Sequence, residues 1–323
     1  MTAVLAVDLG KTGSRAVLWP DGAAVPTKFR EGPGAPGLAA RGGVEAACMA
    51  VVGVCGSFLD AATADIAGYS LCVGAAGALA ARSAARELGH RLLAELPVGD
   101  VAVCSDSTTC HAGALGGRPG VVLAAGTGSV AVGLSRSGRL VRVDGWGPVL
   151  GDAGSGGWIG AAGLRAALRD HDGRGPATGL RLAAVSMFGD IEGLAAIASQ
   201  SDSPAQLAGG FVAEVVRLAE EGDQVAARII ADAAEALAET IIAAGRRLDE
   251  PLVTLAITGG LAAIGPVLWD PVRHRLQNCE VALRWQDALG GPLEGARLLA
   301  RTHGTAHEST IDRAARSAPM FPR

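Results

Sequence analysis

Residues 4–18 read VLAVDLGKTGSRAVL, and residues 121–134 read VVLAAGTGSVAVGL. In both stretches an apolar run leads into a short turn rich in glycine and threonine, and a second apolar run leads out. This pattern is typical of two β-strands joined by a tight turn. Because the two stretches are alike, we interpret them as a degenerate internal repeat, in which each half of the chain opens with the same hairpin.

Outside this repeat, strand-like apolar runs alternate with helical patterns, which indicates α/β architecture with mixed sheets. We expect a strand over residues 101–105 that ends on Asp106, a glycine- and proline-rich loop over residues 31–43, and mainly helices over residues 158–249. A length of 323 residues favours two domains. Together with the repeat, this predicts two similar lobes with a cleft between them.

The composition narrows the class of protein. The net charge is −4 and no basic block is present, which argues against nucleic-acid partners. No apolar run approaches the ~18–20 residues that a membrane span needs, and the N-terminus lacks the charged start of a signal peptide. The six cysteines form no CxxC pair, so we expect reduced, mostly buried thiols. We therefore expect a cytoplasmic protein without a membrane partner.

The two glycine turns, residues 10–13 and 126–129, predict phosphate binding. Glycine-rich turns leave backbone N–H groups free to face an anion, and a threonine hydroxyl adds a donor. Asp8 precedes the first turn, and a carboxylate beside a phosphate cradle suggests Mg²⁺, held through water. The alternative is an aspartate that bonds to the backbone of its own turn.

Asp106 is the candidate catalytic residue. It ends the apolar run VAVCSD and starts a helical stretch. An aspartate at this position is often a helix N-cap. The functional interpretation is a general base that accepts the proton of an attacking hydroxyl, because ligands of doubly wound folds sit at the carboxyl ends of strands.

Several motifs, in order, resemble a known superfamily. DLGKTGSR (8–15), the Asp106 segment, AAGTGS (124–129) and TGGLA (258–262) are similar to the phosphate 1, catalytic, phosphate 2 and adenosine motifs of the actin/hexokinase/Hsp70 ATPases. GWGPVLGDAGSGGWIG (145–160) more specifically resembles the BadF/BadG/BcrA/BcrD group and its N-acetylglucosamine kinase members. The resemblance spans about residues 3–302.

The resemblance implies a two-lobed actin-like ATPase fold, ribonuclease H-like, with duplicated βββαβαβα lobes. Residues 1–115 would form the N-terminal lobe and residues 116–290 the C-terminal lobe. Residues 291–306 would form a closing helix that packs back on the N-terminal lobe. Residues 307–323 would form a flexible tail.

In that family a phosphoryl group passes from Mg-ATP to the 6-hydroxyl of a sugar, so the resemblance implies ATP and Mg²⁺ as cofactors, with Asp106 as base and Asp8 at the metal. The residues that would line the sugar site are Gly145, Trp146 and Asp152, with Thr127 at its edge. Those that would bind ATP are Gly10, Lys11, Thr12, Gly126, Thr127 and Gly128 at the phosphates, and Gly259 and Gly260 at the adenosine.

Two departures from the family pattern concern the sugar. Ala35 lies where the family often has an asparagine, and Ala153 replaces the acid of GDEGS. We expect an amino-sugar kinase that forms a homodimer, with N-acetylglucosamine first and glucosamine second as substrate. The alternatives are an ATPase that activates a 2-hydroxyacyl dehydratase and a non-catalytic sugar sensor.

Overall fold

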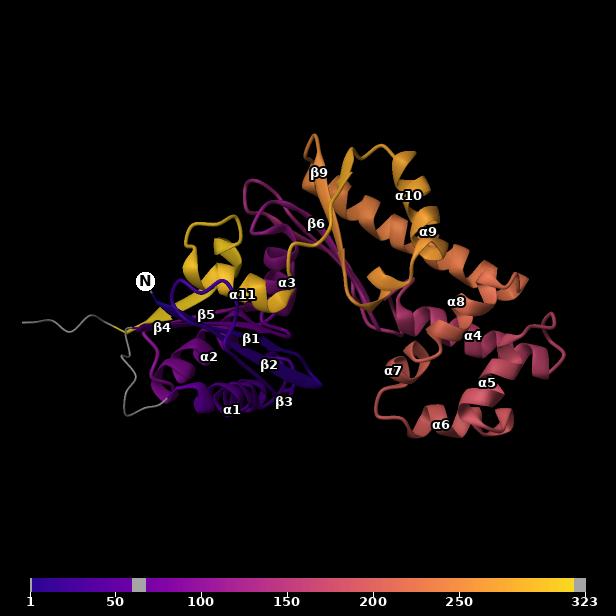
Figure 1. The fold of residues 1–323 in the computed structure, drawn as a ribbon, viewed down its shortest axis with the longest axis horizontal. Coiled ribbons are helices and arrows are strands. Elements are labelled where there is room, and N and C mark those ends of the chain that lie inside the picture. The colour runs from indigo at the N-terminus through magenta and orange to yellow at the C-terminus, as the bar shows by residue number, and fades with distance from the viewer. Residues whose placement is uncertain (1, 60–67, 317–323) are drawn as a thin grey trace, which may run out of the picture. The chain divides into compact units, whose positions relative to one another are not determined.

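The computed structural model describes residues 2–59 and 68–316 (Figure 1). The chain divides into two compact units, each built around one mixed sheet with helices packed on it. The expected α/β architecture with two lobes is therefore confirmed. The first unit comprises residues 1–119, 134–140 and 287–323, and the second comprises residues 120–133 and 141–286.

The first unit contains a six-stranded sheet with the order β11-β5-β4-β1-β2-β3. Strands β1, β4 and β5 are parallel, whereas β2, β3 and β11 each run antiparallel to the strand they join. The strands are β1 (Ala3–Leu9), β2 (Gly13–Trp19), β3 (Lys28–Pro33), β4 (Tyr69–Ala75), β5 (Asp100–Ser105) and β11 (Asp312–Ala315).

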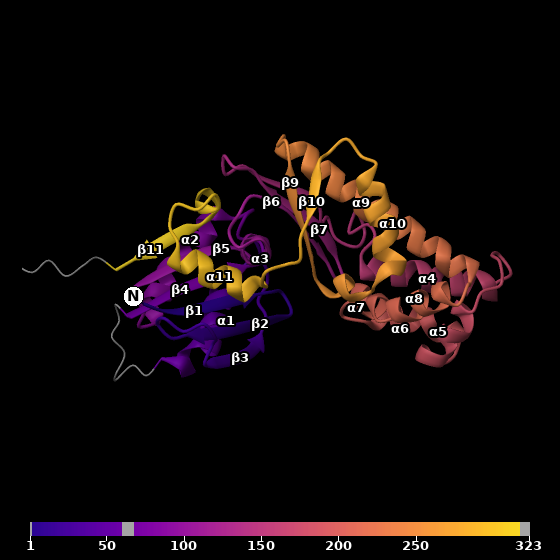
Figure 2. The same ribbon diagram turned by 45° about the horizontal axis from the view of Figure 1, so that its top comes forward.

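Strand β1 is apolar on both faces because helices cover both sides of this sheet (Figures 1 and 2). Leu5, Val7 and Leu9 belong to the core shared with α1 and α2. Val4 and Ala6 belong to the core shared with α3 and α11. The helices of this unit are α1 (Gly43–Cys55), α2 (Arg82–Glu95), α3 (Asp106–Leu115) and α11 (Pro292–Arg301), with short 3₁₀ turns η1 (Gly56–Phe58) and η5 (Glu308–Thr310).

Helices α3 and α11 approach each other so closely that only glycine fits at the contact. A Cβ at Gly113 would lie 1.9 Å from the carbonyl oxygen of Gly291, and a Cβ at Gly295 would lie 1.9 Å from the carbonyl oxygen of Thr109. This contact fixes α11 against α3, the helix that begins at Asp106.

The sheet of the second unit has the order β10-β9-β6-β7-β8, which repeats the β5-β4-β1-β2-β3 order of the first sheet. The internal repeat seen in the sequence is thus a repeat of topology. The strands are β6 (Gly120–Ala125), β7 (Ser129–Leu134), β8 (Leu140–Asp144), β9 (Val253–Thr258) and β10 (Leu283–Trp285). The helices are α4 (Gly156–His171), α5 (Leu180–Phe188), α6 (Leu194–Gln200), α7 (Pro204–Gly209), α8 (Val212–Glu220), α9 (Gln224–Leu248) and α10 (Pro266–Gln277), with 3₁₀ turns η3 (Ile191–Gly193) and η4 (Gly260–Ala263).

Two predicted segments differ in the structure. Residues 31–33 belong to β3 rather than to the glycine- and proline-rich loop, because they pair with β2. The flexible tail predicted from residue 307 is wrong for residues 307–316: β11 joins the sheet beside β5, and His307 is fully buried. Residues 317–323 of the predicted tail lie outside the described residues.

Among the described residues, no single helix is long and apolar enough to cross a bilayer. The bent pair formed by α5 and η3–α6, with 75° between its parts, reaches that length and apolar character only when the two parts are taken together.

Candidate active site

The first glycine turn, residues 10–13, follows β1 and is supported by the loop that follows β3. The N–H of Ala35 in that loop donates to the carbonyl of Gly10 at 3.1 Å. Lys11 and Thr12 at the tip of the turn are exposed. The turn is therefore held from behind while its polar side chains remain accessible to a ligand.

Asp8 lies opposite Arg15 in the β1–β2 register. Its Oδ2 is 2.5 Å from Nη2 of Arg15, and its side chain is 16% exposed. The carboxylate thus pairs with an arginine rather than with its own turn.

Asp106 is the first residue of α3, but it is not the cap of that helix. Ser105 is the N-cap, and its hydroxyl accepts from the N–H of Ser107 at 3.1 Å. Oδ1 of Asp106 accepts from the hydroxyl of Ser105 at 3.0 Å and from the N–H of Ser107 at 2.8 Å. Oδ2 has no hydrogen-bond partner among the residues that the structure describes. One oxygen thus orients the carboxylate, and the other is available as a proton acceptor.

Asp106 and the first glycine turn both follow the carboxyl ends of parallel strands in the same sheet. Leu9 pairs with Ala75, and Ala75 pairs with Ser105, so β1, β4 and β5 all end at this edge. At a strand spacing of about 4.8 Å, the ends of β1 and β5 are roughly 10 Å apart.

The second glycine turn follows β6 and rests on the start of α4. The N–H of Gly156 donates to the carbonyl of Gly126 at 2.7 Å, and the N–H of Gly157 donates to the carbonyl of Thr127 at 2.9 Å. First-turn N–H groups of a helix lack partners within the helix. The turn satisfies two of them and is fixed in return.

Gly259 and Gly260 lie beside this second turn. Strands β6 and β9 are parallel neighbours, with Ala124 paired with Thr258, so both glycine segments lie at the same edge of the sheet. Gly259 has a φ of 91°, and a Cβ there would lie 2.4 Å from the carbonyl oxygen of Ala125. Both the backbone conformation and the close contact therefore require glycine.

A cavity of about 740 Å³ opens beside these two glycine segments. This is within the usual size range of small-molecule sites. Its walls are mainly glycine and aliphatic side chains, with two charged residues. They are Gly126, Thr127, Gly156, Gly209, Gly210, Val212, Ala213, Val216, Arg217, Glu220, Gly260, Leu261 and Ile264.

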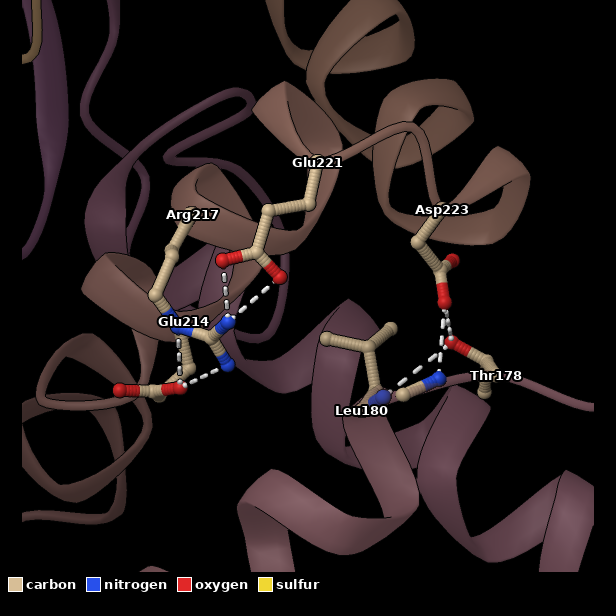
Figure 3. A network of polar contacts seen from close by, with 7 residues as sticks. Thr178, Leu180, Glu214, Arg217, Glu221 and Asp223 are labelled. Atoms are coloured by element: carbon tan, nitrogen blue, oxygen red, sulfur yellow. Dashed lines mark hydrogen bonds and ion pairs between the residues drawn. The ribbon is translucent and has the colours of Figure 1, made fainter.

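Helix α8 forms one wall of the cavity. Val215 and Leu218 on its other face are buried in the core. Arg217 is held between Glu214 and Glu221 (Figure 3): its Nη1 lies 2.7 Å from both oxygens of Glu221, and its Nη2 lies 2.8 Å from Oε2 of Glu214. The two carboxylates fix the guanidinium at the cavity wall.

A second contact in the same view ties the loop after α8 to the start of α5. Asp223 caps α9 and also accepts from the N–H of Gly179 and the hydroxyl of Thr178, both at 2.8 Å (Figure 3). Burial disfavours the charged form of Asp223, but these hydrogen bonds outweigh it and lower its pKa. The cavity wall is therefore anchored at its far end by an ionised carboxylate.

Asp152 belongs to the 145–160 segment and lies beside the second glycine turn. Its Oδ1 accepts from the N–H of Gly147 at 3.2 Å. A Cβ at Gly128 would lie only 2.8 Å from its Oδ2, so the carboxylate is adjacent to that turn. Oδ2 has no hydrogen-bond partner among the described residues. The structure thus brings together Asp152, which the sequence assigned to the sugar, and Gly128, which it assigned to the phosphates.

Trp146 and Gly145 lie in the same segment, directly after β8. The Trp146 side chain is 67% exposed, and the guanidinium of Arg142 lies 4.8 Å from the centre of its ring. Gly145 has a φ of 71°, which favours glycine. One face of the indole is covered by the arginine, and the other is open to a ligand.

A family model covers almost the whole chain. The model is that of the BadF/BadG/BcrA/BcrD ATPase family, and it matches residues 5–300. The chain belongs to this family. The expected family membership is thus confirmed.

Relatives of this BadF/BadG/BcrA/BcrD ATPase include proteins named as kinases. It is 30% identical over 219 residues to an N-acetylmuramic acid/N-acetylglucosamine kinase of Clostridium acetobutylicum, covering 64% of this chain and 69% of that protein. It is 32% identical over 188 residues to an N-acetyl-D-glucosamine kinase of Dictyostelium discoideum, covering 56% of this chain and 59% of that one.

Solved structures show the same fold. A protein from Chromobacterium violaceum assigned as an N-acetylglucosamine kinase superposes with a TM-score of 0.68 at 25% identity, covering 93% of this chain and 99% of that one. A ROK family glucokinase from Streptomyces griseus superposes with a TM-score of 0.55 at 20% identity, covering 93% and 99%. The actin-like ATPase fold expected from the motifs is thereby confirmed.

Sequence reasoning missed two features of this family member's candidate site. It did not single out the α8 residues that line the cavity, although Val215 and Leu218, three residues apart, mark the opposite face of this helix as core. It also did not single out Asp144, because nothing local distinguishes this residue from an ordinary loop aspartate.

Proposed function

We propose that the protein is an ATP-dependent kinase that phosphorylates the 6-hydroxyl of an amino sugar. N-acetylglucosamine is the preferred substrate in this proposal, and glucosamine is the next. The observation that carries the proposal is the free Oδ2 of Asp106 at the sheet edge that also carries the first glycine turn. The names of the two kinase relatives support the choice of sugar.

In the proposed reaction, Oδ2 of Asp106 accepts the proton of the sugar 6-hydroxyl as its oxygen attacks the γ-phosphorus of ATP, and ADP leaves. Ser105 and the N–H of Ser107 hold Oδ1, so the carboxylate does not need to reorient during the reaction. Most of the remaining catalysis is the positioning of the two substrates.

The two glycine turns would bind the phosphates of the nucleotide. Gly10, Lys11 and Thr12 of the first turn would bind phosphate oxygens, as would Gly126, Thr127 and Gly128 of the second. The adenosine would enter the cavity beside Gly259 and Gly260, whose aliphatic walls suit the faces of a purine.

The Mg²⁺ that accompanies ATP would be held near Asp8. Mg²⁺ keeps several waters and binds through one or two carboxylates together with substrate phosphates. Asp8 is a single, partly exposed carboxylate beside the turn, which fits such a role, although Arg15 occupies its Oδ2. The ion would supply positive charge beside the transferring phosphate.

The sugar would contact the 145–160 segment. Oδ2 of Asp152 would accept sugar hydroxyls, the open face of Trp146 would cover sugar C–H groups, and Gly145 would allow close approach, with Thr127 at the edge of the site. Ala35 is buried against the first turn, and Ala153 carries no acid, so neither adds a polar contact to the sugar.

The test is a coupled ADP-release assay over a panel of sugars. The proposal predicts the highest kcat/KM with N-acetylglucosamine, then glucosamine, and ADP release that depends on sugar. ADP release that is the same with and without any sugar contradicts it.

The colour of the purified protein and its release of ADP distinguish the two alternative functions. A dehydratase activator would carry a coloured iron–sulfur cluster, but four of the six cysteines are buried, and burial raises the pKa of Cys55 to about 12, which keeps its thiol protonated. A non-catalytic sensor would bind sugar and release no ADP.

A further inference from the structure

Asp144, the last residue of β8, closes the 144–153 segment into a ring. Its Oδ1 accepts from the N–H of Asp152 at 2.8 Å, and its Oδ2 accepts from the N–H of Ala153 at 2.9 Å. Hydrogen bonds to a charged acceptor are about twice as strong as neutral ones. The start and the end of the segment are therefore joined by one carboxylate.

The backbone at Asp144 is in a conformation that favours glycine. Its φ is 60°, and that of Asp152 is 56°. Aspartate tolerates the left-handed region better than most residues, but glycine would adopt it without cost. The backbone conformation thus does not require an aspartate at position 144. The reason for an aspartate there lies in the hydrogen bonds that its side chain accepts.

Asp144 determines how Asp152 is oriented. With the N–H of Asp152 bonded to Asp144, the carboxylate of Asp152 extends toward the N–H of Gly147 and toward Gly128, and its Oδ2 has no partner among residues 2–59 and 68–316. Gly151 must be glycine for this arrangement, since a Cβ there would lie 2.2 Å from Oδ1 of Asp144. The free oxygen of Asp152 is therefore positioned through Asp144.

Arg142, on the same strand, holds the other part of the segment. Its Nε donates to the carbonyl of Asp144 at 3.1 Å, its Nη2 donates to the carbonyl of Gly145, and its guanidinium covers one face of Trp146. Arg247 from α9 donates to the carbonyl of Arg142 at 2.8 Å. The segment is thus fixed to the second unit before any sugar binds.

We propose that Asp144 is a positioning residue for the sugar: it does not touch the ligand, but holds Asp152 in the orientation that accepts the sugar hydroxyls. The inference rests on the proposed function, in which Asp152 binds sugar. Preorganising a binding group lowers the ordering cost that binding would otherwise include.

The experiment compares Asp144→Gly, Asp144→Asn, Asp152→Ala and the double variant Asp144→Gly/Asp152→Ala. N-acetylglucosamine and ATP affinities are measured separately by calorimetry, and thermal unfolding is followed in parallel. Asp144→Gly keeps the backbone conformation and removes both hydrogen bonds. Asp144→Asn keeps the shape and one acceptor oxygen.

We expect Asp144→Gly to weaken sugar binding at least about tenfold, because two charge-assisted bonds are lost. Asp144→Asn should recover part of that loss. ATP affinity should stay within about twofold, and the thermal midpoint within about 4 °C, since relief of the strained backbone offsets lost hydrogen bonds. The double variant should bind sugar no more weakly than Asp152→Ala, because Asp144 acts through Asp152.

Three results would overturn the inference. One is normal sugar binding by Asp144→Gly while Asp152→Ala loses it, which leaves the proposed function intact. Another is a parallel loss of sugar affinity, ATP affinity and thermal midpoint, which marks a purely structural residue. The third is unchanged sugar binding by Asp152→Ala, in which case the proposed sugar site fails and the inference fails with it.

Discussion

Asp106 and Asp152 each accept hydrogen bonds through one carboxylate oxygen, from residues close by in the sequence. The second carboxylate oxygen of each has no partner in the described part of the protein. A carboxylate held in this way has a fixed orientation, and its second oxygen can still accept a proton or a hydroxyl. The donors are local in both cases: Ser105 and Ser107 for Asp106, and Gly147 for Asp152.

Asp106→Asn should reduce phosphoryl transfer by ~10²–10⁴-fold, because the amide cannot accept the proton of the attacking hydroxyl. The asparagine keeps an oxygen for Ser105 and Ser107, so ATP binding should not change. The measurements are sugar-dependent ADP release and ATP calorimetry. More than about a tenth of wild-type turnover would rule out Asp106 as the base.

His307 should make stability depend on pH. It is fully buried, and its Nε2 lies 2.9 Å from Nδ1 of His111. Burial, together with His111, lowers the pKa of His307 from 6.5 to about 3. Between these values the unfolded chain binds a proton that the folded chain does not, so stability is full above pH 6.5 and falls as the pH drops toward 3, by ~1.4 kcal/mol per pH unit.

Urea unfolding of the wild type and of His307→Gln at pH 7, 6 and 5 checks this prediction. Glutamine does not titrate, so the free energy of unfolding of the variant should fall less steeply with decreasing pH. Parallel pH profiles of the two proteins would show that His307 does not carry the effect.

At the scale of helices, we predict that a glycine-to-alanine substitution lowers stability at the α3–α11 contact and raises it at an open position of α1. Gly295→Ala should destabilise the protein by ~1–3 kcal/mol or more, because its Cβ would collide with backbone of α3. Gly53→Ala is the control: it lies within α1, and a Cβ there meets nothing within 4 Å. That change should stabilise by roughly 0.5–1 kcal/mol. Urea unfolding measures both, and equal effects would contradict the close contact.

Helix α8 gives a second prediction at this scale. Val216→Trp should fill part of the cavity and weaken ATP binding at least about tenfold, since the adenosine is expected there. N-acetylglucosamine affinity should not change. Val185→Trp, at an exposed position of α5 outside the cavity wall, is the matched control. Calorimetry with each ligand separates the outcomes, and unchanged ATP affinity in Val216→Trp would place the nucleotide elsewhere.

At the scale of the whole molecule, each of the two units carries one glycine turn, and β6 of the second unit stands where β1 stands in the first. We predict that sugar binding closes the two units on each other, which would exclude water as a competing phosphoryl acceptor. Small-angle scattering should show a smaller radius of gyration with saturating N-acetylglucosamine. An identical radius in both states, with binding shown by calorimetry, would argue against closure.

Features set by local sequence could be predicted from the sequence itself. Both glycine turns and the strand that ends before Asp106 lie where their patterns placed them, and α11 (Pro292–Arg301) lies within residues 291–306, for which a closing helix was predicted. The physical reason is local: alternation of apolar residues sets a strand, glycine permits a tight turn, and proline at the first position starts a helix. The likeness of residues 4–18 to residues 121–134 also indicated the duplicated fold.

Features set by distant contacts were decided only by the tertiary structure. β11 forms because β5, some two hundred residues earlier in the chain, offers an open sheet edge, and nothing within residues 307–316 reveals that edge. The cavity face of α8 depends on the glycine segments packed opposite it. The role of Asp144 depends on two backbone N–H groups that the fold brings back to the end of β8. Sequence periodicity specifies which elements form, whereas their partners are chosen by packing and hydrogen bonding across the chain.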